Sequence, residues 1–145
     1  MKPSTGLRNH VLASGSVKAA FDGVSEIRIY AGAIPADADA ATTGATLLVT
    51  LKKDGTDGIS FAASPAGGVL AKNPSETWTG LIAASGAPAF FRHVITGDAD
   101  GESTAALRYQ GSVGVVGAEI NLTSAALVSG ESQALAYYQF TWPAG

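Results

Sequence analysis

Apolar and polar residues alternate along most of this chain with a period of two, which is typical of strands in a half-buried β-sheet. Between Glu26 and Ala31, the residues at positions 27, 29 and 31 share one face and those at positions 26, 28 and 30 share the other. Comparable patterns predict further strands over residues 16–21, 46–52, 59–63, 69–71, 76–83, 87–96, 104–113, 118–122, 126–128 and 133–142.

Turn residues separate these strands at intervals of about 8–12 residues, the spacing expected of a sandwich or barrel. The clearest turn is Lys-Asp-Gly-Thr-Asp-Gly at residues 53–58. Because the connections are short, neighbouring strands should pair antiparallel. We therefore predict an all-β fold, an antiparallel β-sandwich or jelly roll, as a single domain over residues 1–145. The longest connection, residues 34–44, is expected to hold a helical turn.

The alternation also predicts which side chains form the core. In the range 104–113, Leu107 and Tyr109 should point inward and Arg108 and Gln110 outward. In the range 133–142, the apolar face should carry Ala136, Tyr138, Phe140 and Trp142. The predicted core residues are Ile29, Val49, Trp78, Phe91, Leu107 and Phe140, with Phe90 competing with Phe91 for the buried face.

The first residues predict a short helix over 4–14, within an N-terminal arm of residues 1–15. Ser4 or Thr5 can cap its start, Leu7 and Val11 share one face, and Gly15 ends it. A helix of this length is unstable alone in water. We therefore expect it to pack on the body of the protein or on a neighbour.

Composition limits the range of functions. Charged residues make up 14% of the chain, against about 25% in a typical globular protein. The resulting surface of small residues suits burial against other subunits, although a neutral soluble monomer is the alternative. The net charge is −3 and the nine Lys and Arg form no basic stripe, which argues against nucleic-acid binding. The absence of cysteine excludes disulfides and thiol chemistry.

Neither a targeting segment nor a membrane span is indicated by the pattern. Residues 1–10 lack the apolar centre of a signal peptide, and no apolar run approaches the ~18 residues that a span requires. The sequence thus predicts synthesis in the cytoplasm and no membrane partner.

Candidate metal ligands and bases are few. Neither His10 nor His93 belongs to a metal-binding or catalytic pattern, and His93 in an apolar strand is expected to be a structural or interface residue. Residues 98–103 (Asp98, Asp100, Glu102 and Ser103) superficially suggest a calcium loop. However, an EF-hand needs its glycine at the sixth position and a closing Glu where Tyr109 stands, so a hairpin turn is favoured.

The other carboxylates and glycines also have local explanations. Asp37 and Asp39 lie in a connection and Asp54 and Asp57 in a turn, so turn chemistry accounts for each without a glycosidase pair. No Gly-x-Ser-x-Gly motif is present, and the glycines of residues 111–117 do not form a dinucleotide fingerprint, which favours a loop or bulge. We predict no catalytic, cofactor-binding or metal-ligating residues.

Aromatic residues offer one further possibility, a platform on which sugars stack. Core or subunit-contact roles are commoner for aromatic residues in strands. The residues concerned are Tyr30, Tyr109, Tyr137, Tyr138, Trp78 and Trp142.

Several motifs point to a family. They are residues 4–10 (Ser-Thr-Gly-Leu-Arg-Asn-His), 21–23 (Phe-Asp-Gly), 27–32 (Ile-Arg-Ile-Tyr-Ala-Gly), 35–41 (Pro-Ala-Asp-Ala-Asp-Ala-Ala), 68–74 (Gly-Val-Leu-Ala-Lys-Asn-Pro), 78–80 (Trp-Thr-Gly) and 86–92 (Gly-Ala-Pro-Ala-Phe-Phe-Arg). With these motifs the chain resembles small virion proteins of tailed bacteriophages over most of its length. The resemblance implies a structural component of the particle and no functional residues.

Two placements on the virion fit that resemblance. The first is a capsid cement or decoration protein that binds the major capsid protein and stabilises the assembled shell. The second is a tail or head–tail accessory protein. A carbohydrate-binding or enzymatic virion module is a third alternative. We also expect a homo-oligomer, most simply a dimer, in which the N-terminal segment offers Leu7, Val11 and Leu12 to a neighbour.

Overall fold

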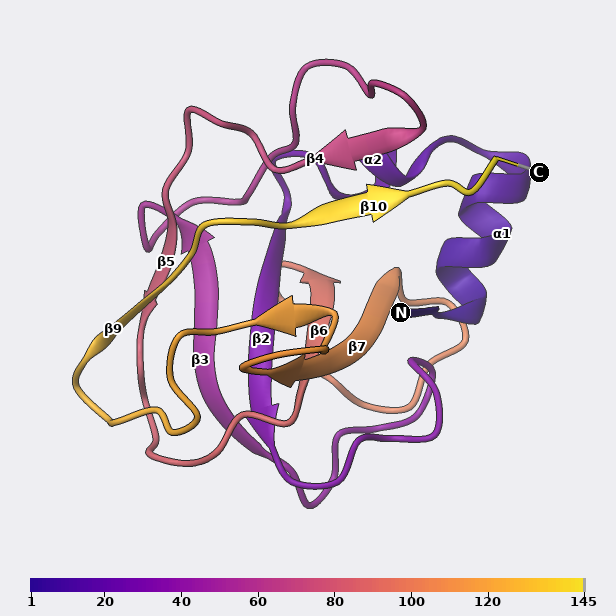
Figure 1. Ribbon diagram of the computed structural model, residues 1–145. Helices are drawn as coiled ribbons and strands as arrows, with labels where there is room; N and C mark the ends of the chain where they lie inside the picture. Colours follow the sequence, from indigo (N-terminus) through magenta and orange to yellow (C-terminus); the bar gives the residue numbers. More distant parts are fainter. Residues whose placement is uncertain (145) are drawn as a thin grey trace.

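The computed structural model describes residues 1–144, which form a large β-sheet, a two-stranded ribbon and two short helices (Figure 1). The predicted all-β sandwich class with a short N-terminal helix is confirmed. The elements in chain order are β1 (Lys2–Pro3), α1 (Thr5–Ala13), α2 (Val17–Phe21), β2 (Ser25–Ala31), β3 (Thr46–Lys53), β4 (Val69–Ala71), β5 (Trp78–Leu81), β6 (Phe90–Ile95), β7 (Arg108–Gly114), β8 (Ile120–Asn121), β9 (Ser132–Leu135) and β10 (Gln139–Thr141).

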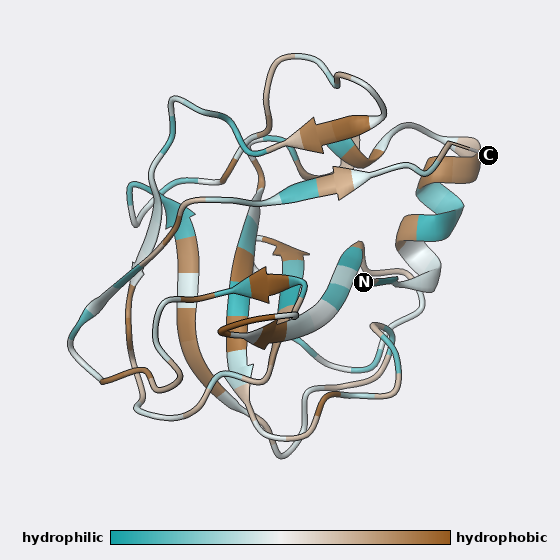
Figure 2. Cartoon of the chain, in the orientation of Figure 1, coloured by the Kyte–Doolittle hydropathy of each residue, from teal (hydrophilic) through white to brown (hydrophobic). Residues whose placement is uncertain are grey.

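The main sheet has the order β1-β7-β6-β2-β3-β5-β9, and all these neighbours pair antiparallel. Short β8 is the exception to the expected antiparallel pairing, because it runs parallel to the end of β7. Strands β4 and β10 pair with each other and form the second layer. The hydrophobic core lies between this ribbon and the sheet, and Figure 2 shows apolar and polar residues alternating along β2.

The core agrees with most of the prediction. Ile29, Val49, Trp78 and Phe91 are buried, as expected, whereas Leu107 and Phe140 are only partly buried and pack against the core. Phe90 and Phe91 do not compete for one face, because both are buried on opposite sides of β6. Phe90 stacks on Tyr30 with ring centroids 4.9 Å apart.

Three predicted strands do not form, and several others are shorter than expected. Residues 16–21 contain helix α2, because the Ser16 hydroxyl caps it by accepting the Ala19 N–H at 3.0 Å and Phe21 anchors its end in the core. Residues 59–63 and 126–128 form only isolated bridges. The range 34–44 contains bends and a turn but no helical turn.

The predicted last strand divides into two. Strand β9 pairs with β5 at the edge of the main sheet, whereas β10 pairs with β4 in the second layer, so residues 136–138 carry the chain between layers. The expected apolar face is therefore interrupted. Tyr138 is buried and Phe140 partly so, but Ala136 and Trp142 are exposed.

The N-terminal helix packs on the body of the protein. The Ser4 hydroxyl accepts the Leu7 N–H at 3.1 Å as the helix cap and the Arg108 N–H at 3.0 Å from β7. Gly6 lies so close to the Ala105 backbone that a Cβ atom would overlap it. Leu7 is 1% exposed, so the expectation that it is offered to a neighbour is wrong, whereas Leu12 is 84% exposed.

Candidate functional site

Three arginines from adjacent strands share the face of the sheet opposite the core: Arg28 of β2, Arg92 of β6 and Arg108 of β7. Buried cations need nearby acids or other hydrogen-bond acceptors. The loop after β6 supplies Asp98, which accepts two hydrogen bonds from Arg108 at 2.7 and 2.8 Å, and Asp100, which accepts one from Arg28 at 2.8 Å. We call these five residues the arginine layer.

The arginine layer also fixes the loop that follows β2. Arg92 donates to the carbonyl oxygens of Ala40 at 2.6 Å and Asp37 at 3.3 Å. Gln110 accepts a hydrogen bond from Arg92 at 3.0 Å and donates to the Pro35 carbonyl at 2.8 Å. The prediction that Arg108 and Gln110 point outward into solvent is therefore wrong, because this loop and the one after β6 cover that face.

Burial and charge act together on the pKa values in this layer. Burial opposes ionisation of Asp98, but hydrogen bonds from Arg108 and from a backbone N–H outweigh it and lower the Asp98 pKa. Burial and the hydrogen bond to Asp100 raise the pKa of Tyr30. Burial and neighbouring Arg108 lower the pKa of Arg92, against the attraction of Asp100. The lowered pKa keeps Asp98 ionised near neutral pH, and the raised pKa keeps the Tyr30 hydroxyl protonated.

The acidic residues that suggested a calcium loop do not converge on a common point. Asp98 and Asp100 bind arginines, Glu102 is exposed, and the Ser103 hydroxyl accepts the backbone N–H groups of residues 105 and 106 at 3.2 and 3.0 Å. Within residues 1–144, no cluster of three or more His, Asp or Glu is placed to hold a metal ion.

Asp37 and Asp39 organise the loop after β2 in different ways. Asp37 accepts the backbone N–H groups of residues 39 and 40 at 3.0 and 2.9 Å, which is local turn chemistry as predicted. Asp39 instead accepts both the backbone N–H and the hydroxyl of Thr5 at 2.8 and 2.6 Å, and so anchors the start of α1. This long-range contact has no sequence signal.

The remaining turn candidates lie apart from these residues. Asp54 and Asp57 are exposed in the turn after β3, and Asp54 has a positive φ of 50°. In the glycine-rich segment, Gly111 and Gly114 belong to β7 and Gly117 to the loop before β8. Asp54, Asp57 and Gly117 therefore mark turns and Gly114 a strand end, whereas the expected loop or bulge is wrong for Gly111, which lies inside β7 in continuous register with β6.

His93 is fully buried between the sheet and the ribbon. Its Nε2 atom lies 2.8 Å from the Ser25 hydroxyl and its Nδ1 atom 3.1 Å from the Tyr138 hydroxyl. Because the Ser25 hydroxyl donates to the Phe21 carbonyl, the imidazole must donate from Nε2 and accept at Nδ1. Burial lowers the His93 pKa to about 3, so the ring is neutral. His10 lies apart from it, on α1.

The six aromatic residues do not form one sugar-stacking platform. Trp78, Tyr30 and Tyr138 are buried, whereas Tyr137 and Trp142 are each 72% exposed. Trp78 and Tyr138 instead pack together in the core, with ring centroids 5.7 Å apart.

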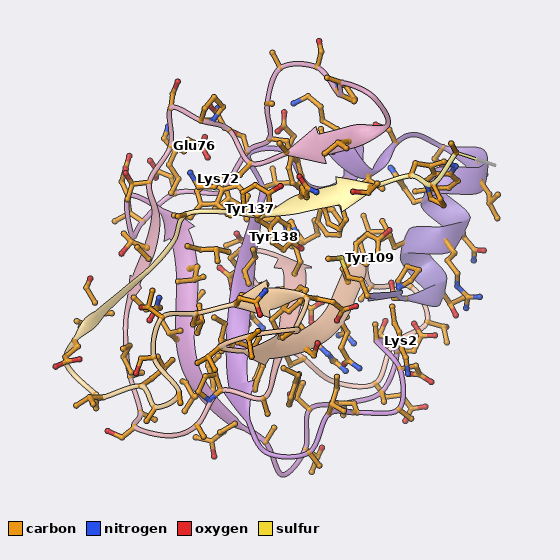
Figure 3. The ribbon with its side chains drawn as sticks, in the orientation of Figure 1. Lys2, Lys72, Glu76, Tyr109, Tyr137 and Tyr138 are labelled. Atoms are coloured by element: carbon orange, nitrogen blue, oxygen red, sulfur yellow. The ribbon has the colours of Figure 1, made fainter. Side chains whose placement is uncertain are left out.

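An apolar groove lies between the N-terminal elements and β10, and we call it the N-terminal groove. It encloses about 650 Å³, and an adjoining hollow of about 210 Å³ extends it beneath α1. Tyr109 lies between β10 and the N-terminal strand and lines both parts (Figure 3). Phe140 packs on Tyr109 with centroids 4.5 Å apart, and Trp142 also lines both parts. Other lining residues include Pro3, Leu7, Val11, Leu12, Val17 and Leu70.

The charged groups that line the N-terminal groove are all cationic. They are the N-terminal ammonium group, Lys18 and Arg8. Glu119 pairs with the ammonium group and Asp22 with Lys18, at 2.6 Å for the second pair. Arg8 forms no ion pair within residues 1–144 and donates to the Thr5 hydroxyl. The groove therefore combines an aromatic floor with a weakly positive rim.

None of the helices within residues 1–144 has the length and apolar character needed to cross a membrane. Comparisons with protein-family models, with curated proteins and with solved structures found nothing that matches this chain.

Proposed function

We propose that this chain is a structural protein of a tailed-bacteriophage virion, and that it binds the outside of the assembled capsid as a cement or decoration protein. The sequence motifs that resemble small virion proteins are the first support. A stabilising role requires a rigid scaffold and a surface that other subunits can cover.

The observation that carries the proposal is where these motifs lie in the fold. Residues 4–10 form the cap and body of α1, and residues 35–41 receive hydrogen bonds from Thr5 and from the arginine layer. Residues 27–32 and 86–92 contribute Arg28 and Arg92 to that layer. The polar side chains that could perform chemistry thus hold loops onto the sheet, which favours a structural role and argues against an enzyme.

The surface of the protein carries exposed apolar side chains that neighbouring subunits could cover. Leu12, Leu81, Val116, Tyr137 and Trp142 are exposed apolar side chains, in a chain with only 14% charged residues. Desolvating such a surface costs little, and repetition over a shell turns modest contacts into strong binding through avidity. A dimer would place two such surfaces on adjacent capsid subunits.

Quantitative mass spectrometry of purified virions tests this proposal. Copy numbers in a fixed ratio to the major capsid protein are expected for a cement protein. Copies restricted to a single ring at the neck or tail favour the accessory-protein alternative. Absence from purified virions would overturn the proposal, and binding on a glycan array together with low copy number would favour a carbohydrate-binding module.

A further inference from the structure

Strand β10 has an outer edge with unpaired backbone groups. The Lys72 N–H donates to the Tyr138 carbonyl at 2.8 Å, and the Trp142 N–H donates to the Gly68 carbonyl at 2.8 Å. In the antiparallel register with β4, this spacing makes Phe140 and Leu70 a hydrogen-bonded pair. The N–H and C=O groups of residues 139 and 141 therefore point away from β4, and no hydrogen bond reaches them from residues 1–144.

That free edge borders the N-terminal groove. Gln139, Phe140 and Thr141 line one side of the groove, and Met1 and Pro3 line the other. Strand β1 is itself the end of the main sheet. Figure 1 shows β10 between β4 and the N-terminal strand. The residues that line the groove come from both the sheet and the ribbon. Added strands commonly occupy such edges.

We propose that the N-terminal groove binds an extended, acidic segment of a partner protein, which adds as an antiparallel strand to the free edge of β10. The backbone of the segment would pair with residues 139 and 141. The residue between these two contacts would lie opposite Phe140 and point to the same side, toward the floor that contains Tyr109. An apolar side chain suits this position because Phe140, Leu70 and Val17 surround it.

Charge complementarity selects acidic residues at the ends of the segment. The charged groups of the lining are cationic, and Arg8 is exposed and makes no direct ion pair within residues 1–144, although its charge helps to lower the pKa of nearby Asp39. The N-terminal ammonium group and Lys18 are already paired, so Arg8 supplies most of the attraction. The inference concerns the groove itself and holds whether the partner is a capsid protein or another protein.

A titration followed by NMR tests the inference. The probe is the acetylated and amidated peptide Asp-Thr-Val-Thr-Asp, in which the valine is placed opposite Phe140. The control peptide carries N-methyl groups on its two threonine nitrogens, which removes the N–H groups that would bond to β10. We expect binding of the first peptide, slower amide exchange at Gln139 and Thr141, and about tenfold weaker binding of the methylated peptide.

A matched pair of variants tests the same edge from the protein side. Thr141→Pro removes the N–H that faces the groove and is compatible with an edge strand, whereas Thr141→Ala keeps it. We expect the peptide to bind Thr141→Ala normally and Thr141→Pro about tenfold more weakly. Equal binding of the methylated and unmethylated peptides overturns the proposal even if the proline variant fails to fold. The proposal is also wrong if the peptide fails to bind while decanoate, a small apolar carboxylate, binds in the groove.

Discussion

The Nε2 atom of His93 lies 2.8 Å from the hydroxyl oxygen of Ser25, and this contact fixes the tautomer in which Nε2 carries the proton. The Ser25 hydroxyl already donates its proton to the Phe21 carbonyl at 2.7 Å. A protonated imidazole would need acceptors at both nitrogens, in a position where burial disfavours charge.

This arrangement predicts a dependence of stability on pH. The His93 pKa is lowered to about 3 in the fold, against about 6.5 when unfolded. The contribution of His93 to the free energy of unfolding is therefore fully present above pH 6.5. It falls by about 1.4 kcal/mol per pH unit as the pH drops toward 3, because the unfolded state binds the extra proton.

Urea unfolding at a series of pH values between 6.5 and 4.5 measures this slope before most carboxylates titrate. His93→Gln should be less stable at pH 7 and should lose most of the slope in this interval. An unchanged slope in His93→Gln would show that another group is responsible.

The ion pair between Asp98 and Arg108 is expected to contribute strongly to stability. Asp98→Ala leaves the buried guanidinium without its carboxylate, at an expected cost of about 3–5 kcal/mol in the free energy of unfolding. The control is Asp57→Ala, since Asp57 is exposed in a turn; this substitution should change stability by less than about 0.5 kcal/mol. Chemical denaturation of both variants makes the comparison, and equal midpoints would contradict the role assigned to the arginine layer.

Truncation of the two tryptophans should affect the free energy of unfolding to very different degrees. Trp78 is fully buried and its indole N–H donates to Glu76 at 2.8 Å, so Trp78→Ala should cost roughly 3–5 kcal/mol. Trp142 is largely exposed, and Trp142→Ala should leave the free energy of unfolding almost unchanged. If Trp78→Ala unfolds at the same denaturant concentration as the unaltered protein, its place in the core is wrong.

Binding to virus particles should depend on Leu12 and not on the whole N-terminal segment as a detachable arm. Deleting residues 1–14 removes Leu7 and strand β1, so the truncated protein should be strongly destabilised. Leu12→Asp, in contrast, should keep its stability within about 0.5 kcal/mol and bind particles more weakly. Leu7→Ala is the matched control, with an expected loss of about 2–5 kcal/mol. Full occupancy of particles by Leu12→Asp would exclude this residue as a contact.

The strands could be predicted from the sequence because alternation reports which side chains share a face. Alternation does not report whether that face is exposed to solvent or covered by other parts of the chain. Arg108 and Gln110 were expected outside for this reason, yet two loops cover them, and those loops are held by carbonyl groups that no pattern reveals. Alternation also could not separate a strand from helix α2 at residues 17–21, because five residues cover little more than one helical turn.

The N-terminal groove lay beyond prediction because it depends on the break between β9 and β10. The sequence pattern continues through residues 133–142, whereas the chain changes layer at 136–138. Only that change leaves one edge of β10 unpaired and brings Trp142 beside α1. A periodic pattern cannot signal which strand a segment will pair with.

The cap of α1 also has a consequence for the order of folding during synthesis. The Ser4 hydroxyl bonds to residues 106 and 108, so helix α1 docks on residues that are translated about a hundred positions later. Asp39 anchors the same helix earlier, but strand β1 still has to wait for β7. Strand β1 must therefore remain unpaired until β7 has been synthesised, and closure of the sheet by β1 is expected to be among the last steps of folding.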